Sequence, residues 1–258
     1  MDKKYVFLDL DGTIIDHKNH GVPDSTVKAL QLAEKNGHEM IIATGRPPCL
    51  FYGIEKELGF NTYIAANGRV VVYKGELIHS EVIKTEIIDE LVKVMDENKI
   101  DIAFESMIGY KRRSTYDTLY EKFSDNFNLE IPELDPNYYK NHDIYQIAMF
   151  YENKDFKKFE KIFPMLSFEF SCKYGIDVNN VGGLKEKGIV ALMDHLGFKQ
   201  EDTIAIGDGF NDISMLKHAH VGVAMGNASD VVKNAADFVT DSIDEDGIYN
   251  AFKKLKLI

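Results

Sequence analysis

Short apolar runs alternate with helix-like segments at both ends of the chain, and this alternation restricts the fold more than any other feature. Runs at residues 5–8, 40–43 and 62–65 are too short for helices, and each ends in a polar or glycine-containing turn. Two more runs lie at residues 203–206 and 221–224. Apolar strands of this length are typical of parallel sheets covered on both faces. The sequence therefore predicts an α/β fold with a Rossmann-like core on a parallel sheet.

Helices are expected between these strands, because apolar residues recur there at helical spacing. In residues 24–36, Val27, Leu30 and Ala33 fall on one face, and Gly37 ends the segment. The other expected helices cover residues 49–58, 186–196, 212–218 and 248–255.

The middle of the chain has a different pattern, with more aromatic and charged residues. Residues 101–105 and 144–150 alternate in the way expected of strands with one covered face. Two helices are expected, at residues 85–97 and 155–163. We therefore predict a core made of residues 1–81 and 183–258, with an inserted α+β domain at residues 82–182.

The charge balance argues against a nucleic-acid partner. The chain of 258 residues has 30 Lys and Arg against 42 Asp and Glu, a formal net charge of −12, and the basic run at residues 111–113 is short. The two cysteines are too few for a disulfide scaffold. The start of the chain lacks a signal-peptide pattern and no apolar stretch approaches a membrane span, so we expect a cytoplasmic protein with no membrane partner.

Two carboxylates follow the first apolar run, in the string DLDGT at residues 9–13. Asp9 and Asp11 are two residues apart on leaving a strand, so their side chains can point to the same side. Gly12 permits a tight turn in which backbone N–H groups approach a phosphate. A bare pair of acids at this spacing is equally typical of a solvated turn, whereas the full string after an apolar run is more specific.

Three further strings lie at expected strand ends or helix starts, where open α/β sheets bind their ligands. Thr44 offers a hydroxyl, and Arg46 offers a guanidinium that suits either a phosphate or a surface ion pair. Lys185 and Lys187 lie at the start of an expected helix. Residues 207–212 read GDGFND, and the carboxylates of such a loop suit a hard cation that prefers oxygen ligands.

In this order, the four strings resemble the motifs of the haloacid dehalogenase-like hydrolases. The resemblance implies that Asp9 is a nucleophile, that Asp11 is a general acid and base, and that Thr44 and a lysine contact the phosphate. Lys185 fits the family's spacing, because a glycine and an apolar residue follow three and four positions later. Leu184 departs from the small polar residue usual before that lysine, which keeps Lys187 as an alternative.

The same resemblance assigns the metal and phosphate ligands. It implies that Mg²⁺ binds Asp9, the backbone carbonyl of Asp11 and Asp208, while Asp212 acts through water or orients the lysine. The implied phosphate-binding residues are Gly12, Thr13, Gly45, Arg46 and Asn211.

The position of the insert indicates which branch of this family the chain resembles. The stretch between the first two motifs holds one helix and one strand, too little for the helical cap of the sugar phosphomutase branch. The insert after Thr44 instead looks like the α/β cap of the Cof-like branch, subclass IIB. This resemblance implies a phosphatase that hydrolyses phosphomonoesters of small metabolites, such as sugar phosphates, through an aspartyl phosphate. Candidates for substrate contact or ordinary packing in the cap are Glu105, Arg112, Arg113 and Tyr145.

Two alternatives use the same residues. A phosphotransferase or mutase would share the aspartyl phosphate, but the absence of an early cap argues against it. A phosphorylatable receiver or a non-catalytic phospho-ligand-binding protein would not need all four carboxylates of Asp9, Asp11, Asp208 and Asp212. Sugar phosphates, pyridoxal phosphate and flavin-type phosphates all remain candidate substrates, and the oligomeric state is open.

Overall fold

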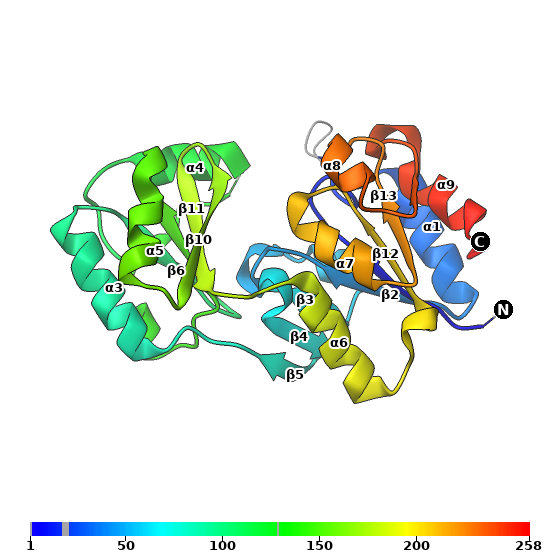
Figure 1. The fold of residues 1–258 in the computed structure, drawn as a ribbon, viewed down its shortest axis with the longest axis horizontal. Coiled ribbons are helices and arrows are strands. Elements are labelled where there is room, and N and C mark those ends of the chain that lie inside the picture. Colours follow the sequence, from blue (N-terminus) through cyan, green and yellow to red (C-terminus); the bar gives the residue numbers. More distant parts are fainter. Residues whose placement is uncertain (1, 17–20, 128) are drawn as a thin grey trace. The chain divides into compact units, whose positions relative to one another are not determined.

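The structure is a computed structural model that describes residues 2–16, 21–127 and 129–258. The chain divides into two compact units, each described by itself below (Figure 1). Unit 1 comprises Met1–Arg46, Gly53–Ser80 and Leu184–Ile258, and unit 2 comprises Pro47–Tyr52 and Glu81–Gly183. The segment Pro47–Tyr52, which the sequence pattern placed in the core, therefore groups with unit 2.

Unit 1 is built on a sheet that has eight strands among the described residues, in the order β14-β13-β12-β1-β2-β3-β4-β5. From β14 to β3 all neighbouring strands are parallel, which confirms the predicted parallel-sheet core. The strands are β1 Tyr5–Leu8, β2 Glu39–Ala43, β3 Tyr63–Ala65, β4 Val70–Tyr73, β5 Glu76–Ser80, β12 Thr203–Gly207, β13 Val221–Ala224 and β14 Phe238–Val239.

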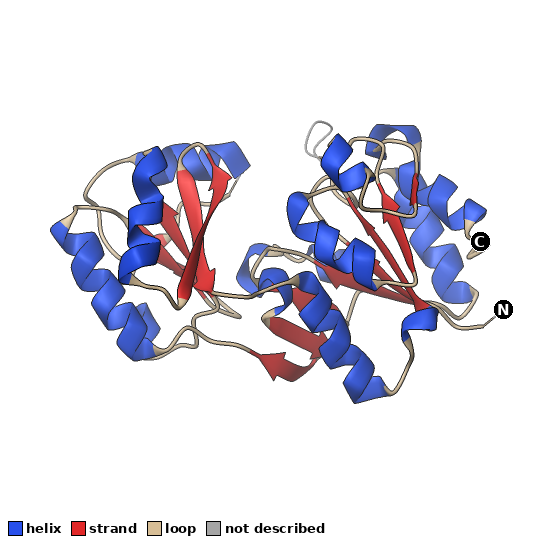
Figure 2. Ribbon diagram, in the orientation of Figure 1, coloured by secondary structure: helices blue, strands red, loops and turns tan. Residues whose placement is uncertain are grey.

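Helices cover the apolar strands of unit 1 (Figure 2). Side chains alternate along a strand, so Phe7 and Ile41 share one face, where they cluster with Ile189, Leu192 and Met215 of two helices. Two other helices, α1 and α9, pack against each other. No helix in the described part of the chain has the length and apolarity needed to cross a membrane. The helices of unit 1 are α1 Asp24–Lys35, α2 Ile54–Glu57, α6 Lys185–Leu196, α7 Ile213–His218, α8 Asp230–Lys233 and α9 Gly247–Lys254.

An edge hairpin of unit 1 was not predicted. β4 pairs with β3 and β5 in antiparallel fashion, so the sheet ends in a meander rather than in another parallel strand. Three of the five residues of β5 are exposed and the other two are half-buried, so its sequence lacks the apolar run of a buried strand. A strand at a sheet edge does not need such a run, because much of it faces water.

The helix expected at residues 49–58 is wrong in its extent. A 3₁₀ turn at Pro48–Leu50 and the short helix α2 replace it. Gly53 separates the two with a φ of +84°, a left-handed conformation that ends a helix. The sequence pattern overlooked this glycine within an otherwise apolar segment.

Unit 2 contains a second sheet, with six strands among the described residues in the order β10-β11-β9-β6-β7-β8. Its neighbouring strands are antiparallel except β7 and β8, which are parallel. The strands are β6 Ile102–Glu105, β7 Tyr110–Arg112, β8 Glu133–Leu134, β9 Gln146–Phe150, β10 Leu166–Cys172 and β11 Gly175–Asn180. The helices are α3 Thr85–Glu97, α4 Leu119–Phe127 and α5 Lys158–Ile162.

The two faces of the second sheet differ in polarity. One face packs on α3 and α5 through an apolar cluster that includes Phe104 and Met149. On the other face, Phe123 of α4 covers only part of the surface, near Ala148 and Phe150. The rest of this face carries a line of polar side chains from successive strands, called the polar row below. Its members are Tyr110, Glu105, Gln146, Asn179 and Ser167.

Two of the candidates for substrate contact in unit 2 have structural partners instead. The guanidinium of Arg112 lies 3.6 Å from the ring centroid of Tyr120 in α4, at cation–π distance. Arg113 donates a hydrogen bond of 2.9 Å to Asp96 in α3. These contacts favour the packing interpretation for both arginines.

Candidate active site

The carboxyl ends of β1, β2 and β12 bring the predicted motifs together. β1 is in parallel register with β2 on one side and β12 on the other, so Asp9, Thr44 and Asp208 follow strand ends that lie side by side. The backbone N–H of Asp9 continues the ladder by donating to Ile206 at 3.0 Å. Open α/β sheets bind ligands at this edge.

Lys185 connects two of the predicted acidic residues. It is the first residue of α6, and its side chain is fully buried. Its Nζ donates to a carboxylate oxygen of Asp9 at 2.5 Å and to one of Asp212 at 2.5 Å. Lys187, the alternative, is exposed. The structure therefore places Lys185, not Lys187, beside the predicted nucleophile.

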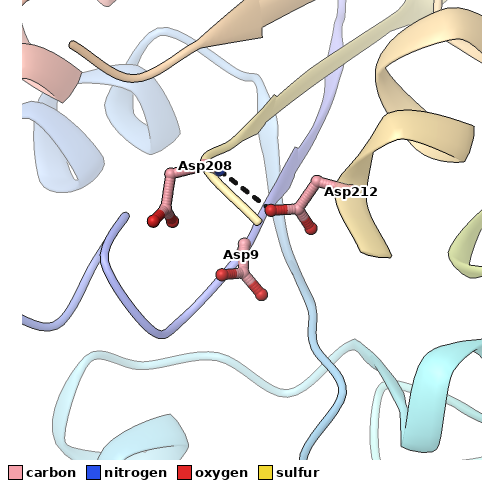
Figure 3. Close-up of side chains that lie close together, drawn as sticks. All are labelled: Asp9, Asp208 and Asp212. Atoms are coloured by element: carbon pink, nitrogen blue, oxygen red, sulfur yellow. Dashed lines mark hydrogen bonds between the residues drawn. The ribbon is translucent and has the colours of Figure 1, made fainter. Parts of the chain in front are cut away.

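Asp212 fastens the loop that carries it. Its Oδ2 accepts a hydrogen bond from the backbone N–H of Asp208 at 2.9 Å (Figure 3) and another from that of Gly209 at 2.8 Å. Its Oδ1 accepts the bond from Lys185. Both oxygens are thus engaged, which matches the predicted role of orienting the lysine better than that of a direct metal ligand.

Asp208 is held beside the turn of the first motif. Its Oδ1 accepts a hydrogen bond from the hydroxyl of Thr13 at 2.8 Å. Gly12 has a φ of +82°, and a Cβ at this position would lie 2.3 Å from Asp208 Oδ2. The close approach of the two motifs therefore requires glycine for two reasons, its conformation and its missing side chain.

Burial and charge shift the ionisation of these groups. Burial raises the pKa of Asp9 well above its ordinary value, and repulsion from Asp212 adds to this shift while Lys185 opposes it. Burial also raises the pKa of Asp208 to about 6, although the Thr13 hydroxyl opposes the shift. Burial works against the charge of Lys185, but Asp212 and Asp9 outweigh it and raise the pKa of this lysine. The cluster therefore carries more negative charge than one lysine balances.

The carboxylates of Asp9, Asp208 and Asp212 fit a metal ion. Each offers an oxygen, and these oxygens lie within 4.8 Å of one another (Figure 3). Carboxylate oxygens suit hard cations, and a cation would oppose the burial and the mutual repulsion that raise the pKa values of Asp9 and Asp208. Because Asp212 is already engaged, Asp9 and Asp208 are the side chains best placed to bind the ion directly.

Arg46 contacts the second acid of the first motif. Its Nε donates to Asp11 Oδ2 at 2.8 Å and its Nη2 to Asp11 Oδ1 at 2.5 Å, a bidentate pair. Thr44 is buried, and its hydroxyl accepts a hydrogen bond from the backbone N–H of Arg46 at 3.1 Å. The structure thus joins the first and second motifs through an ion pair of Arg46 whose partner, Asp11, the sequence analysis did not identify.

Two asparagines of this edge were missed by the sequence analysis. Asn67 lies just after β3, and its Oδ1 accepts a hydrogen bond of 3.0 Å from Asn211. Asn227 lies after β13, and its Nδ2 donates to the carbonyl of Gly12 at 2.9 Å. Each is an asparagine beside a glycine just past the end of a strand, and this position is the signal that could have identified them.

Comparisons with known proteins identify the family of the chain. A family model described as haloacid dehalogenase-like hydrolase matches residues 6–252. The chain is 35% identical over 258 residues to the putative phosphatase YkrA of Bacillus subtilis, covering all of both chains. It is 28% identical to the 5-amino-6-(5-phospho-D-ribitylamino)uracil phosphatase YcsE of Bacillus subtilis, covering 98% of this chain and 96% of the relative.

A solved structure supports the same classification. It is that of BT4131, described as a sugar phosphatase of subclass IIB of the HAD superfamily. It superimposes with a TM-score of 0.84 at 32% identity, covering 99% of this chain and all of that one. The chain described here therefore belongs to the haloacid dehalogenase-like hydrolases, in the Cof-like subclass IIB, and is a phosphoric monoester hydrolase.

Proposed function

We propose that the protein is a magnesium-dependent phosphatase that hydrolyses phosphomonoesters of small hydroxylated metabolites through a phosphorylated Asp9. The observation that carries this proposal is the buried Lys185, hydrogen-bonded to Asp9 and Asp212 at the ligand-binding edge of the sheet. Such an ammonium group offsets the repulsion between a carboxylate nucleophile and a phosphate.

In the first step, a carboxylate oxygen of Asp9 attacks phosphorus and the bond from phosphorus to the leaving alcohol oxygen breaks. Lys185 stabilises the negative charge that Asp9 and the phosphate bring together. The hydroxyl of Thr44 and the amide of Asn211 hold phosphate oxygens, so that nucleophile and leaving group are in line.

Asp11 gives a proton to the leaving alcohol in that step. In the second step it takes a proton from water, which attacks phosphorus, breaks the bond to Asp9 and releases inorganic phosphate. The bidentate ion pair with Arg46 favours the ionised form of Asp11. We therefore propose that Arg46 turns from Asp11 to the bound phosphate, which leaves Asp11 able to hold the proton.

Magnesium would be held by Asp9, Asp208 and the backbone carbonyl of Asp11, where it would supply positive charge to the phosphate oxygens. The donor set consists of oxygens, and burial raises the pKa of Asp208 to about 6, a shift that a bound cation would oppose. Asp212 supports this arrangement indirectly, through Lys185 and the backbone of residues 208 and 209.

The polar row of unit 2 holds buried polar atoms that lack hydrogen-bond partners. Within the described residues, one buried atom of each member lacks a hydrogen-bond partner: Tyr110 Oη, Glu105 Oε2, Gln146 Oε1, Asn179 Oδ1 and Ser167 Oγ. Buried polar atoms are normally paired, so this row has capacity for a polar ligand. Hydroxyl groups both donate and accept, which suits such a mixed set.

The relatives agree with this substrate class. YcsE is named for a substrate with a phosphorylated ribityl chain, and BT4131 is described as a sugar phosphatase. Burial, followed by repulsion from Asp177, raises the pKa of Glu105 well above its ordinary value, which favours the neutral acid. The row is therefore better suited to an uncharged hydroxylated group than to a second charged group.

Phosphate release from a panel of sugar, polyol, pyridoxal and aryl phosphates tests the proposal. We expect turnover with magnesium, none with EDTA, and none for Asp9→Asn, while Asp244→Asn, which changes an exposed carboxylate, stays active. Acid quenching with a labelled substrate should trap label on wild type but not on Asp9→Asn. Turnover without a metal, or substantial turnover by Asp9→Asn, would contradict the mechanism. Folded protein that binds phosphate esters without turnover would favour a binding role.

A further inference from the structure

A short left-handed turn follows β3. Ala66, Asn67 and Gly68 have consecutive φ values of +48°, +52° and +93°. Residues other than glycine adopt this conformation rarely, and asparagine tolerates it best. Strained backbone of this kind persists where the surrounding structure holds it, and it concentrates at functional sites.

The backbone of this turn is tied to the second motif. The N–H of Ala66 donates to the carbonyl of Arg46 at 3.0 Å, and the N–H of Asn67 donates to the carbonyl of Thr44 at 3.1 Å. These two bonds fix the residues that carry the predicted phosphate-binding hydroxyl and guanidinium. The turn therefore forms part of the support for this motif.

The turn also packs closely on the start of α6. A Cβ at Gly68 would lie 2.3 Å from the carbonyl oxygen of Leu184, the residue before Lys185. In the other direction, a Cβ at Gly188 would lie 3.2 Å from the Cα of Gly68. Two glycines thus allow the backbone of the turn to touch the backbone of the lysine-bearing helix.

The side chain of Asn67 completes the set by reaching the fourth motif. Its Oδ1 accepts the hydrogen bond from Asn211 Nδ2. A Cβ at Gly45 would lie 3.2 Å from both of these atoms. The paired carboxamides of Asn67 and Asn211 therefore lie directly against the backbone of Gly45.

We propose that Asn67 is a positioning residue for the phosphate group, acting through Asn211. The hydrogen bond to Asn67 fixes the carboxamide plane of Asn211, so that the remaining N–H of Asn211 Nδ2 faces a phosphate oxygen beside Gly45. Asparagine serves here because its acceptor oxygen and its tolerance of positive φ are both needed. The inference rests on the proposed phosphate-binding role of Asn211.

The test compares Asn67→Gly, Asn211→Ala and the double variant. Glycine adopts the positive φ readily and removes the side chain that carries the carboxamide, so the fold should persist, as the thermal midpoint will show. We expect Asn67→Gly to raise both KM for an aryl phosphate and Ki for inorganic phosphate by roughly tenfold, the size typical of one hydrogen bond, with a smaller change in kcat. The double variant should be no worse than Asn211→Ala, because residues that act as one unit are not additive.

Two controls separate this role from a general effect on folding. Lys74→Gly relaxes a left-handed residue with the same φ of +48° in the turn between β4 and β5, and it should leave KM and Ki unchanged. Asn67→Asp keeps the acceptor oxygen but adds negative charge, and it should weaken phosphate binding more than Asn67→Gly does. Normal Ki in Asn67→Gly or Asn67→Asp, or additive effects of Asn67→Gly and Asn211→Ala, would overturn the proposal. Calorimetry measures phosphate binding even if no ester is hydrolysed, so a failure of this inference can be distinguished from a failure of the proposed hydrolysis.

Discussion

The guanidinium of Arg46 donates two hydrogen bonds, of 2.8 and 2.5 Å, to the carboxylate of Asp11. If the guanidinium turns to phosphate when substrate binds, Arg46→Ala should lower kcat/KM by about 10- to 100-fold, since each tenfold corresponds to about 1.4 kcal/mol. The variant Arg46→Lys keeps the charge but loses the bidentate geometry, so its kcat/KM should lie between those of wild type and Arg46→Ala. Steady-state kinetics on one aryl phosphate measures this. An unchanged kcat/KM in Arg46→Ala would assign the arginine to a surface ion pair only.

Lys185 should matter for stability as well as for turnover. Lys185→Met leaves Asp9 and Asp212 buried without their cation, and breaking a buried pair in this way costs about 3–5 kcal/mol. Urea unfolding in EDTA measures the loss. Lys187→Met on the exposed side of the same helix should change the free energy of unfolding by less than about 0.5 kcal/mol. Equal stability of the two variants would show that the buried contacts of Lys185 contribute little.

Gly12 and Gly37 form a matched pair for alanine substitution. Both have positive φ, +82° and +92°, so each alanine should cost about 1 kcal/mol or more in backbone strain. Only at Gly12 would the new Cβ meet Asp208. We therefore expect Gly12→Ala to abolish metal-dependent turnover and Gly37→Ala to leave it intact, with both showing lower thermal midpoints. Full activity in Gly12→Ala would contradict the close approach of the two motifs.

Glu105 should make the protein less stable as the pH rises. Burial raises its folded-state pKa above the ordinary value of 4.5, so the folded form keeps its proton to a higher pH than the unfolded form does. Stabilisation is therefore present below pH 4.5 and is lost as the pH rises through the folded-state pKa, by at most about 1.4 kcal/mol per pH unit.

Urea unfolding of wild type and Glu105→Gln between pH 4 and 8 isolates this contribution. Glutamine does not titrate, so the variant should gain stability relative to wild type as the pH rises. Glu169→Gln changes an exposed carboxylate on the same face and should show no such trend. A constant difference between Glu105→Gln and wild type would mean that Glu105 ionises normally in the folded protein.

The parallel core could be predicted because its strands are buried on both faces, and such strands consist of continuous apolar runs that are visible in the sequence. β5 could not be predicted in this way, because three of its five residues are exposed. The prediction of one helix over residues 49–58 was wrong for a local reason. Gly53 adopts a left-handed conformation that interrupts the helix, although the apolar residues around it favour one.

The site shows a similar division. Asp9, Thr44, Lys185 and Asp208 could be located because each follows a strand or starts a helix in a recognisable string. The partners of Arg46 and Asn211 could not, because Asp11 is 35 residues from Arg46 and Asn67 is 144 residues from Asn211. Such pairings depend on strand order and register, which a periodic pattern does not specify.

The engagement of both oxygens of Asp212 affects the choice of an inactive variant for capturing a bound substrate. Asp212→Ala would release two backbone N–H groups and half of the lysine's support, so the loop would be free to rearrange around whatever is captured. Asp9→Asn keeps the hydrogen bonds of Asp212 to that loop and replaces the nucleophilic carboxylate with a neutral carboxamide. A complex trapped in Asp9→Asn should therefore preserve the native pose of the ester.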